Sequence, residues 1–192
     1  MTVSLAKGGN ISLDAAVADL KAVYVGLGWE ERDTAGEDFD LDASAFLLKD
    51  NGKVRRDDDF IFYNNLRSGD GSVEHSGDNL TGAGEGDSEV LKIDLSAVPP
   101  EIVRIAVTVT IHDADARRQN FGQVRDAYIR VVNQADNVEI VRFDLSEDMS
   151  TETAMIFGEI YRRGGQWKFK AVGQGYSGGL EALCRNFGVD VS

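Results

Sequence analysis

The stretch that decides the fold is IVRIAVTVTI, residues 102–111. It is almost continuously apolar and rich in β-branched side chains, which favour extended backbone. A short run of this kind, preceded by a Pro99-Pro100 pair that marks a loop, is typical of a strand covered on both faces. The sequence therefore predicts a central strand over 102–111.

Further strand-like segments lie on both sides of this run. Most are short and are separated by clusters of Gly, Asn, Asp or Ser. Arg163–Gln166 predicts a tight hairpin. Helical patterns are confined to 114–121, on a connection, and 180–187, which Gly188 would end. The other strands are predicted over 23–27, 39–48, 60–63, 90–95, 128–132, 140–144, 154–162 and 167–172.

Many short strands with few helices favour an all-β fold, a two-sheet β-sandwich with one or two short helices, over a sheet built from βαβ units. No linker or repeat is visible, so residues 1–192 are expected to form a single domain. A chain of this length can bury a core without disulfide bonds. Cys184 is the one cysteine, which excludes an internal disulfide and fits a reducing compartment.

Charge narrows the class of partner. Lys and Arg number 20 and Asp and Glu number 33, which gives a formal net charge of −13. Such a surface attracts cations and repels phosphate backbones and anionic lipid, which argues against direct binding of nucleic acid or membrane. No apolar run approaches the roughly 20 residues of a membrane-spanning helix, and the first residues lack the features of a signal peptide. We therefore expect a cytoplasmic protein.

The acidic residues are grouped. In DFDLDASA, residues 38–45, polar and apolar residues alternate, so on a strand Asp38, Asp40, Asp42 and Ser44 share one face. Carboxylates this close repel one another, because they lie within the screening length of physiological salt. A divalent cation would turn the repulsion into attraction, since hard cations bind carboxylate oxygens. The alternative is a solvated acidic surface.

This segment is not an EF-hand loop. If Asp38 were its first position, a Gly should follow at the sixth position and a Glu at the twelfth, but Ala43 and Lys49 stand there. Helical patterns do not flank the segment either.

A second acidic stretch is DNLTGAGEGDSE, residues 78–89. Its glycines allow backbone carbonyls to turn inward, towards a cation. A phosphate-binding loop is disfavoured, because Glu85 and Asp87 would repel phosphate and no helix pattern follows. The side-chain oxygens that this stretch offers to a metal belong to Asp78, Asn79, Asp87 and Glu89.

Neutral oxygens lie between the two acidic stretches. Asn64 and Asn65 follow an apolar strand, and the segment 68–71 either adds oxygens or forms a turn. His75, His112 and a single cysteine are too few for a typical transition-metal site. For His112 we expect a hydrogen-bonding role at a strand end.

Five long stretches carry a resemblance to a known family: 3–13, 38–48, 60–89, 110–133 and 142–180. They include DFDLDASAFLL, SGDNLTGAGEGDSE and GQGYSGGL. In these stretches, which span essentially the whole chain, the sequence resembles the TerD family of bacterial tellurium-resistance and general-stress proteins.

The resemblance implies a calcium-binding β-sandwich domain over residues 1–192, with two neighbouring sites and hence two calcium ions. Asp38 matches a position that varies in the family, and Asp87-Ser88-Glu89 departs from the consecutive acids that relatives often carry. Carried over position by position, the metal ligands would be Asp38, Asp40, Asp42, Asn64, Asn65, Asp78, Asn79, Asp87 and Glu89.

The resemblance also implies a function: a stress-response protein implicated in tellurite resistance that acts as a calcium-dependent adaptor or scaffold. Its partners would be other tellurium-resistance proteins, including a membrane-anchored one that recruits it to the inner face of the membrane. We do not expect an enzyme, because the sequence shows no Ser-His-Asp signature and no flavin or nicotinamide fingerprint. A metal-dependent enzyme and a purely structural calcium protein remain the alternatives.

Overall fold

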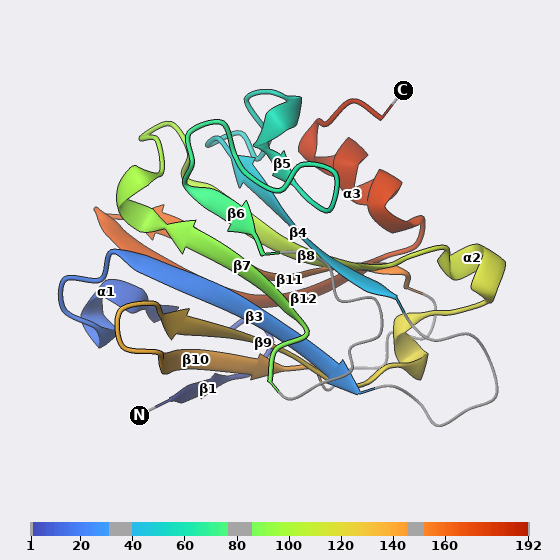
Figure 1. Ribbon diagram of the computed structural model, residues 1–192, viewed down its shortest axis with the longest axis horizontal. Helices are drawn as coiled ribbons and strands as arrows, with labels where there is room; N and C mark the ends of the chain where they lie inside the picture. The colour runs from blue at the N-terminus through green and yellow to red at the C-terminus, as the bar shows by residue number, and fades with distance from the viewer. Residues whose placement is uncertain (1, 31–39, 77–85, 146–151, 192) are drawn as a thin grey trace.

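Two six-stranded sheets lie face to face in the computed structural model, which describes residues 2–30, 40–76, 86–145 and 152–191 (Figure 1). Buried apolar side chains from both sheets fill the space between them. This architecture confirms the predicted two-sheet β-sandwich.

The first sheet, sheet A, has the strand order β1-β10-β9-β3-β7-β6. Strand β1 runs parallel to β10, and the other neighbours in the sheet are antiparallel. The bounds are β1 Val3–Leu5, β3 Ala22–Glu30, β6 Val73–His75, β7 Glu89–Asp94, β9 Arg125–Asn133 and β10 Val138–Asp144.

The second sheet, sheet B, has the order β2-β12-β11-β8-β4-β5, and its neighbours are antiparallel. Between β11 and β12 the hairpin predicted at Arg163–Gln166 is present, with Gly164 and Gly165 at φ 60° and 76°. Both angles are those of the turns that suit the twist of a hairpin. The bounds are β2 Asn10–Ser12, β4 Leu41–Leu48, β5 Phe60–Ile61, β8 Arg104–Ile111, β11 Ala154–Arg163 and β12 Gln166–Tyr176.

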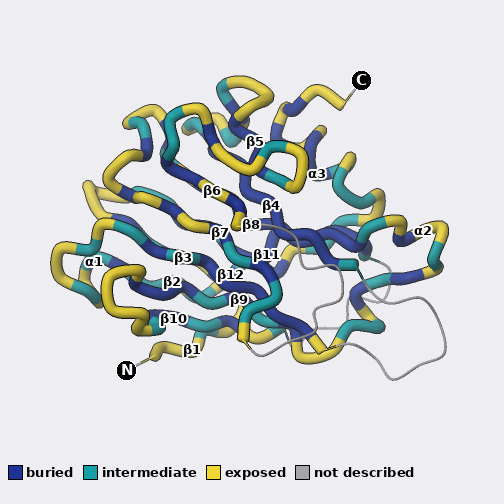
Figure 2. The backbone as a smooth tube through the Cα atoms, in the orientation of Figure 1, coloured by how far each residue is buried: buried dark blue, intermediate teal, exposed yellow. Residues whose placement is uncertain are grey.

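Strand β8 is the central strand that the sequence predicted. It lies between β4 and β11, and every residue from Ile105 to Ile111 is buried, as the dark tube in Figure 2 shows. Ile105 and Val107 face the core between the sheets, whereas Ala106 lies in a second apolar cluster, on the outer face of sheet B. Helix α3, Gly179–Phe187, covers that cluster with Leu183 and Phe187, among others.

The helical segments are short. Helix α2, Ala114–Arg117, is shorter than the predicted 114–121, because Arg118 adopts a left-handed conformation, φ 55°, which ends it. Gly188, at φ 80°, ends α3 as predicted. In the described ranges we find no helix long and apolar enough to cross a membrane. The remaining helical elements are α1 Leu13–Ala16 and the 3-10 turns η1 Asp57–Asp59, η2 Leu95–Ala97 and η3 Phe121–Gln123.

Strands of both sheets meet at one end of the sandwich, on the right-hand side of Figure 1, which we call the loop end. In sheet A, β3 finishes here and β7 begins, with Leu27 paired to Glu89. In sheet B, β4 begins here and β8 finishes, with Leu41 paired to Ile111. The candidate ligands Asp40, Asp42, Asp87 and Glu89 therefore come from strand ends at the same end of the fold.

Candidate functional site

The alternation predicted for the first acidic segment is present in strand β4. Leu41 and Ala43 face the core between the sheets, so Asp42 and Ser44 face the outer side of sheet B. The side chain of Asp42 stands opposite Thr110 of β8, and its residue is only 5% exposed. A carboxylate this buried needs polar or cationic neighbours, because desolvation penalises its charge.

Asp42 opens onto a cleft of about 410 Å³ between the end of β8, helix α2 and the start of α3. The charged side chains that line the cleft are acidic; one of them, Glu181, pairs with Arg185. The imidazole Nε2 of His112 lies 3.4 Å from Asp113 Oδ2. The cleft therefore attracts cations, through the carboxylates of Asp42, Asp113, Asp115 and Glu181.

Asp40 lies just before β4 and is partly buried. Its carbonyl accepts a hydrogen bond of 2.8 Å from the backbone N–H of His112. This bond extends the β4–β8 pairing by one step and holds Asp40 beside the cleft.

Asp87 lies on the outer side of sheet A, where protein groups hold its carboxylate. Arg130 donates two hydrogen bonds to it, from Nε to Oδ1 at 2.9 Å and from Nη2 to Oδ2 at 2.7 Å. The Tyr128 hydroxyl donates a third, to Oδ1 at 2.8 Å. The carboxylate fills the space above Gly26, where a Cβ would stand 2.2 Å from Oδ2. A side chain at this position of β3 would therefore displace the Asp87 carboxylate.

The Asp87 cluster shifts two pKa values. Burial, together with the hydrogen bond to the Asp87 carboxylate and its negative charge, raises the pKa of Tyr128 to about 12. The hydrogen bonds to Asp87 and Glu139 raise the pKa of Arg130 further above its usual value, against the effect of burial. Asp87 and Arg130 therefore form a largely buried ion pair on the outer side of sheet A.

Glu89 points into the sandwich, on the core side of β7 beside Leu91. Its Oε2 lies 3.0 Å from Nε2 of His75 on β6, and both side chains are almost fully buried. A buried carboxylate is stabilised by such a partner, because isolated charge in the interior is costly. His75 is thus the partner of a predicted metal ligand.

The predicted asparagines lie in a turn that follows β5. Asn64 is exposed, and Asn65 is partly buried. Asn65 Nδ2 donates to the carbonyl of Phe60 at 2.8 Å, and backbone bonds join Asn65 to Phe62. The Asn65 side-chain nitrogen therefore holds the turn.

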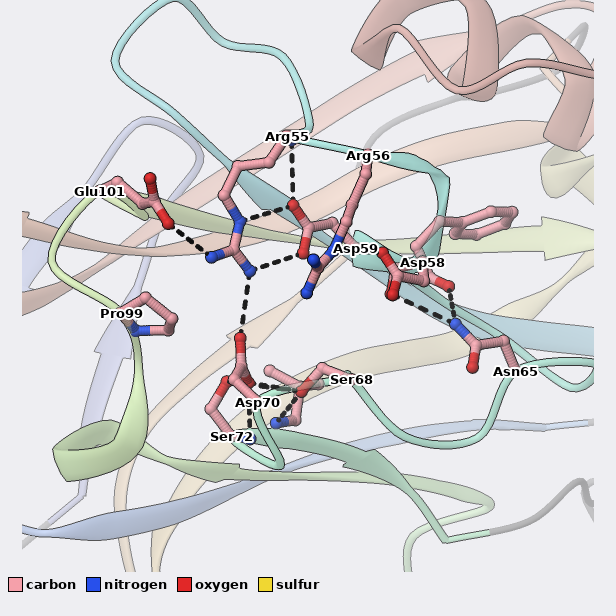
Figure 3. A network of polar contacts seen from close by, with 12 residues as sticks. Arg55, Arg56, Asp58, Asp59, Asn65, Ser68, Asp70, Ser72, Pro99 and Glu101 are labelled. Atoms are coloured by element: carbon pink, nitrogen blue, oxygen red, sulfur yellow. Dashed lines mark hydrogen bonds and ion pairs between the residues drawn. The ribbon is translucent and has the colours of Figure 1, made fainter.

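The segment 68–71 forms a turn held by Asp70, one of the two roles left open by the sequence (Figure 3). The carboxylate accepts hydrogen bonds of 2.8 Å from Ser68 Oγ and from the N–H of Ser72. It also accepts one of 3.1 Å from Arg55. Burial alone would raise the pKa of Asp70, but these hydrogen bonds outweigh it and lower the pKa below its usual value.

Arg55 joins this turn to two other segments (Figure 3). Its Nε and Nη2 donate hydrogen bonds to the Asp59 carboxylate at 2.9 and 2.8 Å, and its Nη1 donates one to Glu101 at 2.8 Å. Hydrogen bonds to Asp59 raise the pKa of Arg55, although burial opposes them. This cluster of acids is therefore a structural network around one guanidinium and not a cation site.

The structure brings Asp40, Asp42, Asp87 and Glu89 to one end of the fold but not onto one surface. Asp42 faces outward from sheet B, Asp87 outward from sheet A, and Glu89 inward between them. Within the described parts of the chain, no three His, Cys, Asp or Glu side chains converge as they would around a metal ion. Asp38, Asp78 and Asn79 lie outside the described residues.

Sequence reasoning missed Arg130 and Tyr128, the partners of Asp87. One signal was available: Gly26 and Gly28 stand two apart in a strand, on the face where a Cβ would meet Asp87 and Tyr128. Small residues at this spacing indicate that something lies close over the sheet. The acidic residues Asp113 and Asp115 were also missed as neighbours of Asp42, because they reach the cleft through helix α2.

The chain is similar over its full length to proteins with stress-related names. It is 64% identical to the tellurium resistance protein TerD of Serratia marcescens and 55% identical to the general stress protein 16U of Bacillus subtilis. Both alignments span 192 residues and cover 100% of each chain.

The fold is similar to a solved structure, a homologue of the telluride resistance protein TerD from Streptomyces coelicolor. That match has a TM-score of 0.67 at 23% identity and covers 85% of this chain and 95% of the other. A second solved structure, a protein of unknown function, gives a TM-score of 0.73 over 89% of this chain and 98% of its own. The TerD domain model matches residues 1–187, and the chain therefore belongs to the TerD family.

Proposed function

We propose that this protein is a calcium-binding stress-response protein that contributes to tellurite resistance as a calcium-dependent adaptor. The names of its full-length relatives, a tellurium resistance protein and a general stress protein, support the biological setting. The observation that carries the chemistry is Asp42, a nearly buried carboxylate on a cleft whose charged lining is acidic.

The oxygen donors suit calcium, which prefers carboxylate, amide and carbonyl oxygens. When bound, calcium would neutralise the clustered carboxylates. In the described structure Asp87 and Glu89 face Arg130 and His75, so calcium would have to displace these side chains there. For two ions we propose the ligands Asp38, Asp40, Asp42, Asn64, Asn65, Asp78, Asn79, Asp87 and Glu89.

A binding role is supported over catalysis by the state of the nucleophiles in the described residues. Cys184 is buried, and burial together with the charges of Asp57 and Glu181 raises the pKa of its thiol to about 11. Ser44 Oγ, buried on the same face as Asp42, has no hydrogen-bond partner that would activate it among the described residues. We propose a cytoplasmic adaptor for other tellurium-resistance proteins, including a membrane-anchored one.

Calorimetric titration of chelator-stripped protein tests calcium binding. A regulatory site should give a Kd of about 10⁻⁷ to 10⁻⁵ M, and native mass spectrometry should show two ions. Asp40→Asn/Asp42→Asn should lose at least one ion, whereas Asp50→Asn/Glu74→Gln, which removes the same charge elsewhere on the surface, should lose neither. Equal calcium binding by both variants would contradict the assignment of Asp40 and Asp42.

A pull-down with a membrane-anchored tellurium-resistance protein separates the adaptor from a structural calcium protein. Capture in calcium and release by chelator support the adaptor. A calcium-dependent rise in melting temperature without capture would favour the structural alternative. Turnover of tellurite by the pure protein with an electron donor, lost in Asp40→Asn/Asp42→Asn, would instead establish the enzyme.

A further inference from the structure

Helix α3 covers only part of the outer face of sheet B. The covered part holds the apolar cluster that includes Phe46, Ala106 and Ile156. On the uncovered part, the strand register places two rows of side chains next to one another. One row is Ser12, Lys168, Tyr161 and Arg104, and the next is Asn10, Lys170 and Glu159.

The uncovered part is basic, although the chain as a whole carries a net charge of −13. Directly opposed residues of antiparallel strands point to the same side, about 5 Å apart. Lys168, Lys170 and Arg104 therefore share one surface, and Arg163 joins them because it lies two residues after Tyr161. We call Arg104, Arg163, Lys168 and Lys170 the basic face.

Only part of this positive charge is neutralised within the face. The carboxylate of Glu159 accepts a charged hydrogen bond of 3.1 Å from Arg104 Nε. Arg163 and Lys170 are exposed, and Lys168 is partly exposed. A groove of about 350 Å³ runs over this surface, lined among others by Asn10, Arg104, Glu159, Tyr161, Arg163 and Lys170.

We infer that the basic face is a docking surface for a short acidic segment of a partner protein. A carboxylate bound within about 8 Å of the basic face, the screening length at physiological salt, is attracted by it. The acidic residues elsewhere on the surface lie further away, so salt screens their repulsion. A long polyanion such as DNA extends beyond the face and meets the acidic remainder of the surface. The charges therefore favour a short carboxylate-bearing peptide.

The basic face is separate from the proposed calcium site. Along β8, Arg104 and Thr110, the residue opposite Asp42, are six positions apart, which corresponds to about 20 Å. The inference names a partner chemistry for the proposed adaptor and rests on that part of the proposed function. It does not require calcium to bind.

The test uses the full-length protein and a fluorescein-labelled peptide of alternating Glu and Thr, about eight residues long, to span the two rows. Anisotropy at low salt should show binding that weakens as salt is added. Lys168→Glu/Lys170→Glu should weaken binding at least about tenfold. Lys168→Arg/Lys170→Arg should retain it, and the matched control Lys21→Glu/Lys92→Glu should stay within about twofold of wild type.

The place where the peptide binds is checked by the changes in amide NMR chemical shifts when peptide is added, which should be largest in β11 and β12. The inference is overturned if the wild type does not bind the peptide, or if the control loses as much affinity as the Lys168/Lys170 variant. It is also overturned if single-stranded DNA binds through Lys168 and Lys170 more tightly than the peptide does. The same holds if Lys168→Glu/Lys170→Glu abolishes self-association of the protein and leaves peptide binding unchanged. Peptide binding that is equal in calcium and chelator supports the basic face while contradicting the calcium-dependent adaptor.

Discussion

The carboxylate of Asp87 occupies the space that a side chain on Gly26 would need. A Cβ at Gly26 would stand 2.2 Å from Asp87 Oδ2, far inside van der Waals contact. Gly26→Ala should therefore displace Asp87 and destabilise the protein by about 1–3 kcal/mol, the usual cost of forcing extra volume into a packed site. Urea unfolding measures the change.

The matched control is Gly69→Ala. Its Cβ would meet only the flexible ends of Arg56 and Asp58, at 3.2 and 3.4 Å. Its stability should change by less than about 0.5 kcal/mol. Equal effects at the two glycines would show that the Asp87 position does not constrain strand β3.

Removing the charge of Asp87 should be visible at Tyr128. Burial raises the pKa of Tyr128 to about 12, together with the hydrogen bond to Asp87 and the negative charge of that carboxylate. Asp87→Asn should lower it towards the ordinary value of about 10, because the negative charge that disfavours the phenolate is gone. Ultraviolet titration of wild type, Asp87→Asn and Tyr128→Phe identifies the shifted group among the five tyrosines. Tyr176, whose pKa burial also raises, should titrate unchanged in both variants. If the step that Asp87→Asn lowers is still present in Tyr128→Phe, the shift belongs to another tyrosine.

Asp70 should make stability depend on pH in the acid range. Its pKa is lower in the folded protein than in the unfolded chain, so ionised Asp70 stabilises the fold. This contribution is fully present above the unfolded pKa of about 3.9 and is lost as pH falls through the lower folded pKa. The stability difference between wild type and Asp70→Asn should therefore be largest near neutral pH and shrink below about pH 4. A difference that stays constant from neutral to acid pH would contradict this role.

The packing of helix α3 against sheet B should protect Cys184, which lies in that helix, from alkylation. The thiol is buried in the cluster that α3 forms with sheet B, and its pKa is about 11, so little thiolate exists near neutral pH. The ring of Phe187 lies 4.6 Å from that of Phe46. Phe187→Ala should cost about 3–5 kcal/mol and loosen the helix, which would speed reaction with iodoacetamide. Val191→Ala, an exposed change on the same tail, should leave the rate unchanged.

The sandwich could be predicted from sequence because its long strands carry strong signals. The apolar run 102–111 predicted β8, and alternation at 38–45 predicted which side chains of β4 face outward. The edge strands β1, β2 and β6 could not be predicted, because three residues are too few for a visible period. They are specified by the neighbouring strand that pairs with them.

The candidate site could be predicted only as a set of residue types. Alternation correctly placed Asp42 away from the core. It could not place Asp87 against Arg130, since that contact depends on the pairing of β3, β7 and β9. Nor could it place Glu89 beside His75 rather than on the surface. The spacing along the chain shows which oxygen donors are available, whereas the pairing of strands decides which side chain each donor meets.

The first strands of the chain depend on its last third. Strand β1 pairs with β10 and β2 pairs with β12, so neighbouring N-terminal segments form one edge strand of each sheet. During synthesis these segments leave the ribosome long before their partners exist, at roughly 5–20 residues per second. Strand β1 has no strand to pair with until β10, which ends at Asp144, has been made, and β2 has none until β12, which ends at Tyr176. Because the chain is made from its N-terminus, one edge strand of each sheet is therefore paired late. A chain whose synthesis stalls before that point would need protection from aggregation.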